Sequence, residues 1–496
     1  MTKTNKKSRK VNLLRITPIA AAILFSSTIS TSSLFAQETD RNKLPEIGAA
    51  GASILSIEKE RQIGDIAMRQ IRATQPLLND PVLIEYINHL GNQMVKNASD
   101  VNYKFEFFLV RNEELNAFAF FGGHIGIHSG LITSADTESE LASVVAHEIS
   151  HVTQRHLARK MEDQSRTQTL SMAGMLSGVL LTLINPTMGM AALTTSMAAS
   201  QQSSINYTRG NEKEADRVGI KLLSDSGFDP NGAPNFFAKM QEKYRYKSLP
   251  PAMLLTHPLS EARITDARLR AHSLPAVSLP PSLDFELTKS RIKARYEGDP
   301  KSNIAYFKKV LDKRTYALKE AALYGLGMSY FENKEYDKAS EIIEQLFQKD
   351  QNNLFYVDLL SDLFIQTKQF DKAITMLSNL HKLMPNNQVI TLNYANVLHE
   401  AGKHEEAQLL LQDFLLVRPG NMIAYDLLTN IYRKQDKKSQ MHFAKAEVIA
   451  LHGGFSQAVD ELQTAYSVAG DQPLLKKRIK ARILQLQAQE EKIKRL

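Results

Sequence analysis

The chain has 496 residues, of which 43% are hydrophobic and 23% charged, so it is long enough for two or three globular domains. Its net charge of +8 overstates its basic character, because six of the 61 Lys and Arg residues and no acidic residue lie in residues 1–36. The remainder carries 55 basic against 53 acidic residues, a balance that gives no reason to expect nucleic acid as a partner.

Residues 1–36 have the layout of a secretory signal peptide. A basic region precedes the apolar run 19–25, and a polar Ser/Thr-rich stretch then ends at Ala36, after which cleavage is expected. An uncleaved membrane anchor is the alternative, although the apolar run is short for a span. The chain contains no cysteine, so after export it has no disulfides to form wrongly.

Two helices and a small β region are predicted next. Apolar residues at helical spacing predict helices over about 56–73 and 80–97. Residues 104–110 are rich in aromatic and β-branched side chains and predict a strand. The segments 116–121 and 124–128 flank two consecutive glycines, which predicts a β-hairpin.

The stretch from Ala146 to His151 reads H-E-x-x-H. The preceding residues 140–146 are good helix formers with apolar residues on a helical period, so the motif falls on a helix. His147 and His151 are then one turn apart on one face and can hold one Zn²⁺. Glu148 is the expected general base, since it can take a proton from water at that metal.

A catalytic zinc needs a third protein ligand and an open position. In the metzincin pattern that ligand follows at a fixed spacing, but Gln154 and Leu157 stand where Gly and His are required, and His156 is out of register. A carboxylate from a later helix is the gluzincin solution. Glu212 can bind the metal there, while Asp216, one turn on, holds a ligand imidazole from behind or serves as a proton donor.

An edge strand can hold a peptide substrate by adding it to the sheet. Asn116, Ala117 and Phe118 are the candidates for this role, and an internal hairpin without substrate contact is the alternative. His124 and His128 share one face of a strand, and we interpret them as structural or exposed rather than as ligands.

The segment 167–208 contains no charged residue and five of the chain's 16 methionines. One interpretation is a membrane hairpin, but its apolar run 174–184 is about half a span and Pro186 follows it. We favour a soft Met-rich flap beside the site, which grips apolar substrate or rests on a membrane surface. Plain buried core is the third interpretation.

Pro258 fixes the backbone directly after His257, which indicates an aimed imidazole. Our hypothesis is that His257 faces the metal centre. It either stabilises the oxyanion of the tetrahedral intermediate or occupies the fourth zinc position and suppresses activity. A surface turn histidine is the alternative. Ser260 is the expected N-cap of a helix that runs to His272.

The Pro-containing residues 273–285 predict a linker between a domain over 37–272 and a second domain over 286–496. The second domain shows a 34-residue period, which predicts a tetratricopeptide-repeat solenoid with a concave surface for peptides or proteins. Positions that recur with this spacing are Gly327, Ser361 and Ala395; Tyr336, Phe370 and His404; Ala339, Ala373 and Ala407.

We count four repeats in phase and a fifth, resumed at Phe455, out of phase. The basic run 474–496 is expected to form a final solvated helix.

These pieces together resemble the family of periplasmic β-barrel assembly-enhancing proteases of Gram-negative bacteria, which join a gluzincin-type metallopeptidase domain to tetratricopeptide repeats. The motifs behind the resemblance follow the family's order over nearly the whole chain after residue 36. They are Asn116–Ala119, Gly122–Gly123, Glu140–Ala142, His147–His151, Glu212–Asp216 and His257–Pro258.

The resemblance implies an α+β zincin-like metallopeptidase domain, mostly helical with a small sheet, followed by an all-α solenoid. It implies one Zn²⁺ per chain on His147, His151 and Glu212, with Glu148 as the base of a zinc-dependent metalloendopeptidase. In the periplasm, such a protein would degrade stalled or misassembled outer-membrane β-barrel precursors and assist productive ones. Its repeats would dock onto the β-barrel assembly machinery.

Two hypotheses compete with this one. The first is a repeat-based scaffold or chaperone whose peptidase is normally shut, and the second is a membrane-embedded peptidase.

Overall fold

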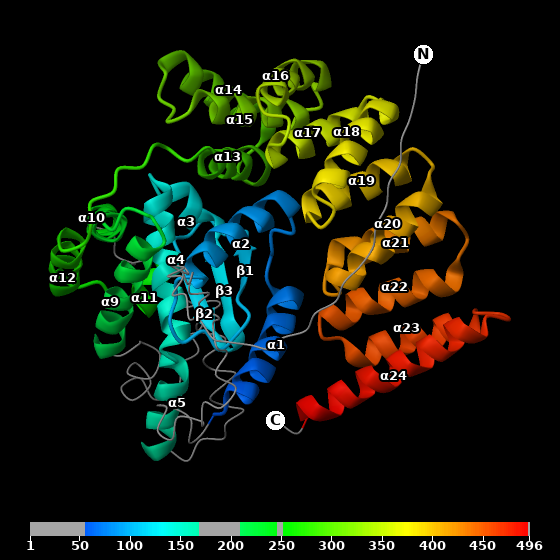
Figure 1. Ribbon diagram of the computed structural model, residues 1–496, viewed down its shortest axis with the longest axis horizontal. Coiled ribbons are helices and arrows are strands. Elements are labelled where there is room, and N and C mark those ends of the chain that lie inside the picture. Colours follow the sequence, from blue (N-terminus) through cyan, green and yellow to red (C-terminus); the bar gives the residue numbers. More distant parts are fainter. Residues whose placement is uncertain (1–54, 168–208, 246–250, 495–496) are drawn as a thin grey trace, which may run out of the picture. The chain divides into compact units, whose positions relative to one another are not determined.

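A computed structural model describes residues 55–167, 209–245 and 251–494 of the chain (Figure 1). The predicted signal peptide lies outside these residues, and so does the Met-rich segment from 168 to 208, so neither prediction is tested. Within the described ranges, no helix is both long enough and apolar enough to cross a membrane.

The first two helices form where apolar spacing predicts them. Helix α1 (Ile57–Thr74) is capped by Ser56, whose side chain accepts a hydrogen bond from the backbone N–H of Lys59. Helix α2 (Pro81–Val95) begins with proline, and the carboxylate of Asp80 caps it. The apolar faces of both helices pack toward the sheet, and this fixes the sheet's position.

The predicted hairpin is present. Strand β2 (Ala117–Phe120) and strand β3 (His124–His128) pair antiparallel, with Phe120 opposite His124. The short turn η1 (Phe121–Gly123) joins them, and both of its glycines have positive φ, which side chains other than glycine rarely adopt.

Strand β1 (Glu106–Val110) begins two residues later than predicted and runs parallel to β3, so the strand order is β1-β3-β2. An antiparallel bridge from Leu77 to Val110 covers the outer side of β1. The outer edge of β2 has no partner strand among the described residues, which leaves it available for an added strand.

Helices surround this sheet, and the central one is α4, which is in contact with β2, α2, α9 and α10 (Figure 1). Every side chain of α4 from Ser139 to Thr153 is buried. The helices that follow the sheet are α3 (Ser129–Ser134), α4 (Glu138–Thr153), α5 (His156–Thr167), α9 (Arg209–Asp225), α10 (Gly232–Tyr244), α11 (Ala252–Thr256) and α12 (Glu261–His272).

The C-terminal half consists of helices joined by short turns, as the repeat pattern predicts. They are α13 (Leu283–Arg291), η2 (Ile292–Tyr296), α14 (Pro300–Lys313), α15 (Lys319–Glu332), α16 (Tyr336–Lys349), α17 (Leu354–Gln366), α18 (Phe370–Leu383), α19 (Gln388–Glu400), α20 (His404–Val417), α21 (Met422–Lys434), α22 (Lys438–Leu451), α23 (Phe455–Ser467) and α24 (Pro473–Lys494). The fold class is therefore as predicted, an α+β part with a small sheet followed by helical hairpins.

The hairpins keep their spacing where the sequence pattern slips. Second helices begin at Tyr336, Phe370, His404 and Lys438, each 34 residues after the last. Phe455 instead begins α23, which is the first helix of the next hairpin. The sequence pattern therefore shifts because Phe455 matches residues that begin second helices, although it begins a first helix itself.

Helix α24 is not fully solvated, because Ile479 and Leu486 are buried.

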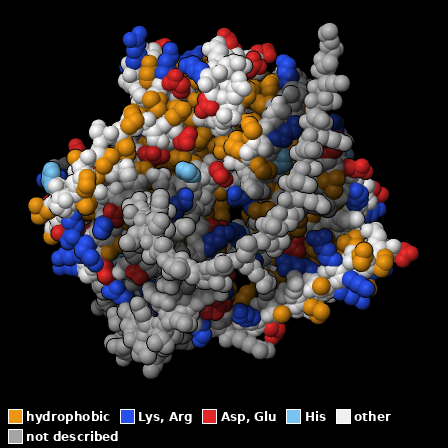
Figure 2. Space-filling model, viewed as in Figure 1, with side chains coloured by type: hydrophobic (Ala, Val, Ile, Leu, Met, Phe, Trp, Pro, Cys, Tyr) orange, Lys and Arg blue, Asp and Glu red, His pale blue; other side chains and the backbone are white. Residues whose placement is uncertain are grey.

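Charged side chains of both signs are interspersed on the face drawn in Figure 2. This distribution agrees with the nearly balanced charge of the chain beyond residue 36.

Candidate metal centre

Helix α4 carries the H-E-x-x-H motif, as predicted. Thr137 caps the helix by accepting from the N–H of Glu140, so the helix begins in a defined register. His147 and His151 lie one turn apart and are 6% and 3% exposed. Their Nε2 atoms are 3.0 Å apart, so both lone pairs can reach one cation.

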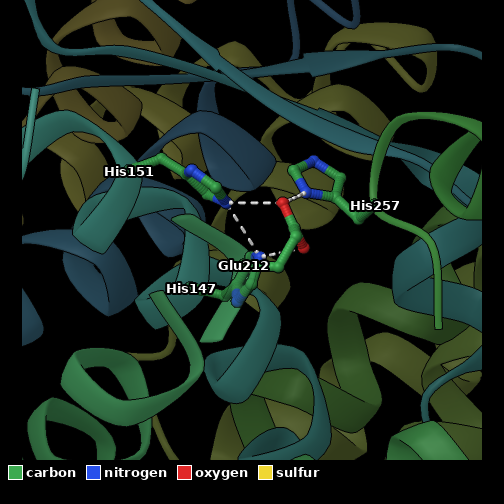
Figure 3. Close-up of side chains that lie close together, drawn as sticks. All are labelled: His147, His151, Glu212 and His257. Atoms are coloured by element: carbon green, nitrogen blue, oxygen red, sulfur yellow. Dashed lines mark hydrogen bonds and ion pairs between the residues drawn. The ribbon is translucent and has the colours of Figure 1, made fainter. Parts of the chain in front are cut away.

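Helix α9 brings a carboxylate to the two imidazoles (Figure 3). Glu212 lies in the first turn of α9, 2% exposed, with Oε2 3.5 Å from His147 Nε2 and Oε1 3.5 Å from His151 Nε2. The two helices approach closely because Gly219 of α9 faces the backbone of His147, where a Cβ would stand 3.1 Å from the amide nitrogen.

His257 completes the group. It follows α11, and its Nδ1 is 3.0 Å from Oε1 of Glu212. One donor atom from each of His147, His151, Glu212 and His257 lies within 4.8 Å of the others. In Figure 3 the four side chains converge on one point from α4, α9 and the end of α11.

The charges in this group fit a divalent cation. Burial alone would lower the pKa of His147, but Asp216 and Glu212 outweigh it and raise that pKa to about 10. Burial would raise the pKa of Glu212, yet the neighbouring histidines hold it well below its usual range. A proton on His147 therefore compensates the negative charge of a buried carboxylate, and a bound divalent cation can supply the same compensation. Imidazoles with one carboxylate are a donor set that suits zinc.

Glu148 lies beside the group and is fully buried. Its Oε1 is 3.5 Å from His257 Nε2, and neither oxygen has a hydrogen-bond partner of good geometry among the described residues. Burial raises the pKa of this carboxyl group. The backbone of Ala119 in β2 also interacts with it, so Glu148 stands between the donor cluster and the open strand edge.

Of the candidate substrate-binding residues, Asn116 shows the clearest signal. Its side chain is 1% exposed, and neither its amide nitrogen nor its amide oxygen has a partner within the described part of the chain. A buried amide with an unmet donor and an unmet acceptor suits a peptide unit laid along β2. Phe118 points elsewhere, because its ring packs against Phe108 at 5.9 Å between ring centroids.

Asp216 stands behind His147, as predicted, with Oδ1 3.1 Å from Nδ1. Sequence reasoning missed its partner. Arg263 of α12 donates to both Asp216 oxygens at 2.7 and 2.8 Å and pairs with Glu212 at 2.8 Å. No spacing rule connects an arginine on α12 to a motif on α9, because only the packing of the two helices brings them together.

The spacing of His156 from the H-E-x-x-H motif predicts that it is not a metal ligand. In the structure its Nδ1 is 2.8 Å from Nδ1 of His151, on the side away from the cluster. Its Nε2 is 3.1 Å from Oε2 of Glu214, which Arg159 contacts at 2.9 Å. The two histidines of strand β3, His124 and His128, lie outside the four-residue group, in keeping with their structural interpretation.

Comparison with known proteins agrees with this geometry. Residues 83–271 match the profile of peptidase family M48, and residues 321–353 and 364–431 match tetratricopeptide-repeat profiles. Fold and site thus define a metallopeptidase of family M48 joined to tetratricopeptide repeats.

Two curated relatives match a longer stretch of the chain than the peptidase profile does. The chain is 41% identical to the beta-barrel assembly-enhancing protease of Yersinia pestis over 69% of its own length and 72% of the relative's. It is 40% identical to the protein of that name from Escherichia coli K12, over 70% and 71%. The chain belongs to the family of β-barrel assembly-enhancing proteases, which confirms the resemblance drawn from its motifs.

Proposed function

We propose that the chain is a periplasmic zinc endopeptidase that degrades misassembled outer-membrane β-barrel proteins and assists the assembly of productive ones. One observation carries the catalytic part: His147 and His151 of α4 and the distant Glu212 of α9 place donor atoms around one point, with the buried Glu148 beside it. The names of the relatives support the role in β-barrel assembly.

Bound zinc supplies Lewis acidity, which lowers the pKa of water and polarises a carbonyl. The chain's own residues do the rest. Glu148 accepts the proton of the attacking water and passes it to the leaving amine. The edge of β2 binds the substrate backbone in an extended conformation, and the amide of Asn116 pairs with one peptide unit. Asp216 keeps His147 oriented from behind.

The repeat helices are the proposed docking surface for the assembly machinery, because stacked helical hairpins recognise peptides and proteins. The proposed location follows from residues 1–36 and from the kind of substrate. The proposed flap at 167–208 would add contact with apolar substrate or a membrane surface.

Metal analysis and casein cleavage of the purified exported protein test the proposal. We expect one zinc per chain, and loss of cleavage with a chelator and recovery with added zinc. Glu148→Gln should retain zinc but lose roughly 10²- to 10⁴-fold in rate, because its amide cannot take a proton. A protein without metal, or one that cleaves casein equally well with Glu148→Gln, would contradict the enzymatic assignment.

A second candidate function is a scaffold or chaperone whose peptidase is normally shut. The position of His257 favours it, since a fourth protein donor at the cluster leaves no open position for water. Replacing His257 with alanine separates the alternatives. Faster cleavage with retained zinc supports a closing role, and slower cleavage supports an oxyanion role. If activity and zinc content are both unchanged, His257 has no part in the site.

A further inference from the structure

The two imidazoles of the H-E-x-x-H motif are held from behind by different groups. Both turn Nε2 toward the cluster and Nδ1 away from it. Behind His147 stands the carboxylate of Asp216, but behind His151 stands another imidazole, that of His156, which is completely buried.

A turn after α4 places His156 in this position. His156 follows His151 by five positions, so one continuous helix would not bring their two Nδ1 atoms together. Helix α4 ends at Thr153, Arg155 adopts φ 52°, and α5 begins at His156. The left-handed conformation of Arg155 is unfavourable for a residue with a side chain. Its guanidinium contacts Glu60 at 2.9 and 2.5 Å, which stabilises the turn.

The number of protons on the two imidazoles determines which of them donates the hydrogen bond between His151 and His156. Two Nδ1 atoms 2.8 Å apart need one donor and one acceptor, and a neutral imidazole carries a single N–H. Glu214 can only accept when ionised, so His156 must carry its proton on Nε2. His156 Nδ1 is then the acceptor, His151 donates from Nδ1, and the lone pair of His151 Nε2 faces the cluster.

Glu214 is also paired with a cation. Arg159 donates to its Oε2 at 2.9 Å, and this is the oxygen that faces Nε2 of His156. The side chain of Glu214 is 27% exposed, in contrast to the 2% of Asp216. The hydrogen-bond chain behind His151 therefore ends at a partly exposed carboxylate, that of Glu214. The one behind His147 ends in the buried pair of Asp216 with Arg263.

We propose that His156 and Glu214 are positioning residues that set the tautomer of His151, so that Nε2 carries a lone pair directed at the metal rather than a proton. This inference rests on the proposed metallopeptidase function and deepens it. With His156 removed, the buried Nδ1–H of His151 loses its acceptor, and the tautomer with the proton on Nε2, which cannot bind a metal, becomes competitive.

Zinc affinity of the metal-free protein, measured by competition with a chromophoric chelator, tests this without any catalytic readout. His156→Leu should weaken zinc binding about 10- to 100-fold. His156→Asn should restore most of the affinity, because its amide oxygen can accept where Nδ1 did. Glu214→Gln should cause a smaller loss, since an amide can donate as well as accept. Lys213→Ala, an exposed neighbour on α9, is the matched control and should bind like wild type.

The outcomes separate the two proposals. Wild-type protein that does not bind zinc would overturn the proposed function itself. Tight wild-type binding with equally tight binding by His156→Leu and Glu214→Gln would overturn only the positioning role. Equal losses in His156→Leu and His156→Asn would also overturn it, because loss of packing rather than loss of an acceptor would then be the cause. If His156→Leu does not fold, as judged by thermal unfolding of the metal-free protein, Glu214→Gln decides, because its site is partly exposed.

Discussion

The groups that contact a buried histidine ring, rather than the residue type alone, determine its pKa. His124 and His128 begin and end the same strand and are both buried. His124 lies 3.3 Å from a carboxylate oxygen of Glu106 and 3.6 Å from Asp65, and these contacts outweigh burial and raise its pKa. Burial dominates at His128 and lowers its pKa to about 4. The same residue type thus has a raised pKa at one end of β3 and a lowered pKa at the other.

This difference predicts a pH-dependent stability. Below about pH 6.5 the unfolded chain protonates His128 but the folded chain does not, so stability falls as the pH drops toward 4. His128→Gln should lack this loss, which amounts to on the order of 3 kcal/mol. The free energy of unfolding, measured from pH 7 to 4 on chelator-treated wild type and variant, checks it. Parallel curves for the two proteins would show that His128 titrates normally.

At the scale of elements, close backbone contacts position the open strand edge. Helix α1 packs directly on the turn η1, because Gly64 has no side chain. A Cβ at this position would meet the carbonyl oxygen of Phe121 at 2.0 Å. Since η1 joins β2 to β3, this contact holds the hairpin whose free edge lies beside Glu148.

Gly64→Ala should therefore destabilise the protein although alanine favours helix. The helix gains about 1 kcal/mol in propensity, but the clash with rigid backbone costs about 3 kcal/mol and displaces the hairpin. We expect a lower urea midpoint and weaker casein cleavage. Gln70→Ala on the exposed face of α1 is the control and should change stability little. If Gly64→Ala is as stable as wild type, α1 can shift freely and does not set the strand position.

At the scale of the whole molecule, buried charges join the repeats to the peptidase part within one compact unit, residues 50–496. Arg291 of α13 is 1% exposed and donates to Asp80 at 2.7 Å, to Asp358 at 2.6 Å and to the hydroxyl of Tyr324 at 2.8 Å. Asp80 is also the N-cap of α2, so one carboxylate serves both parts. A second contact lies near the C-terminus, where Arg69 donates to the carbonyl of Ala450 at 2.7 Å.

Removing Arg291 should uncouple the two parts. Arg291→Leu leaves two buried aspartates without their cation, which costs about 3–5 kcal/mol. We expect wild type to unfold in urea in one transition, and the variant to show separate transitions for the peptidase part and the repeats. Far-UV circular dichroism and zinc release are suitable paired probes.

Arg270→Ala is the matched control, because its partner Asp266 is 38% exposed and such surface pairs contribute less than about 1 kcal/mol. An Arg291→Leu variant that unfolds like this control would show that the apolar contacts alone hold the parts together.

Local patterns determined the elements of this protein. Apolar spacing places α1, α2 and α4 correctly, and Ser260 is the N-cap of α12 as predicted. Two consecutive glycines predict the β-hairpin, and the 34-residue period predicts the helical hairpins. The spacing of His147 and His151 also brings two donor atoms together within one helix turn. Each of these is a contact between near neighbours in the chain, so its periodicity can be read directly.

Only the tertiary structure decided which distant groups meet. Glu212 and His257 reach the histidines through the packing of α9 and α11. Helix crossings and a left-handed turn give Arg263 and His156 their roles, and the strand order leaves the edge of β2 open. Contacts of this kind have no sequence period, since they depend on how buried faces pack rather than on the spacing of residues along one element.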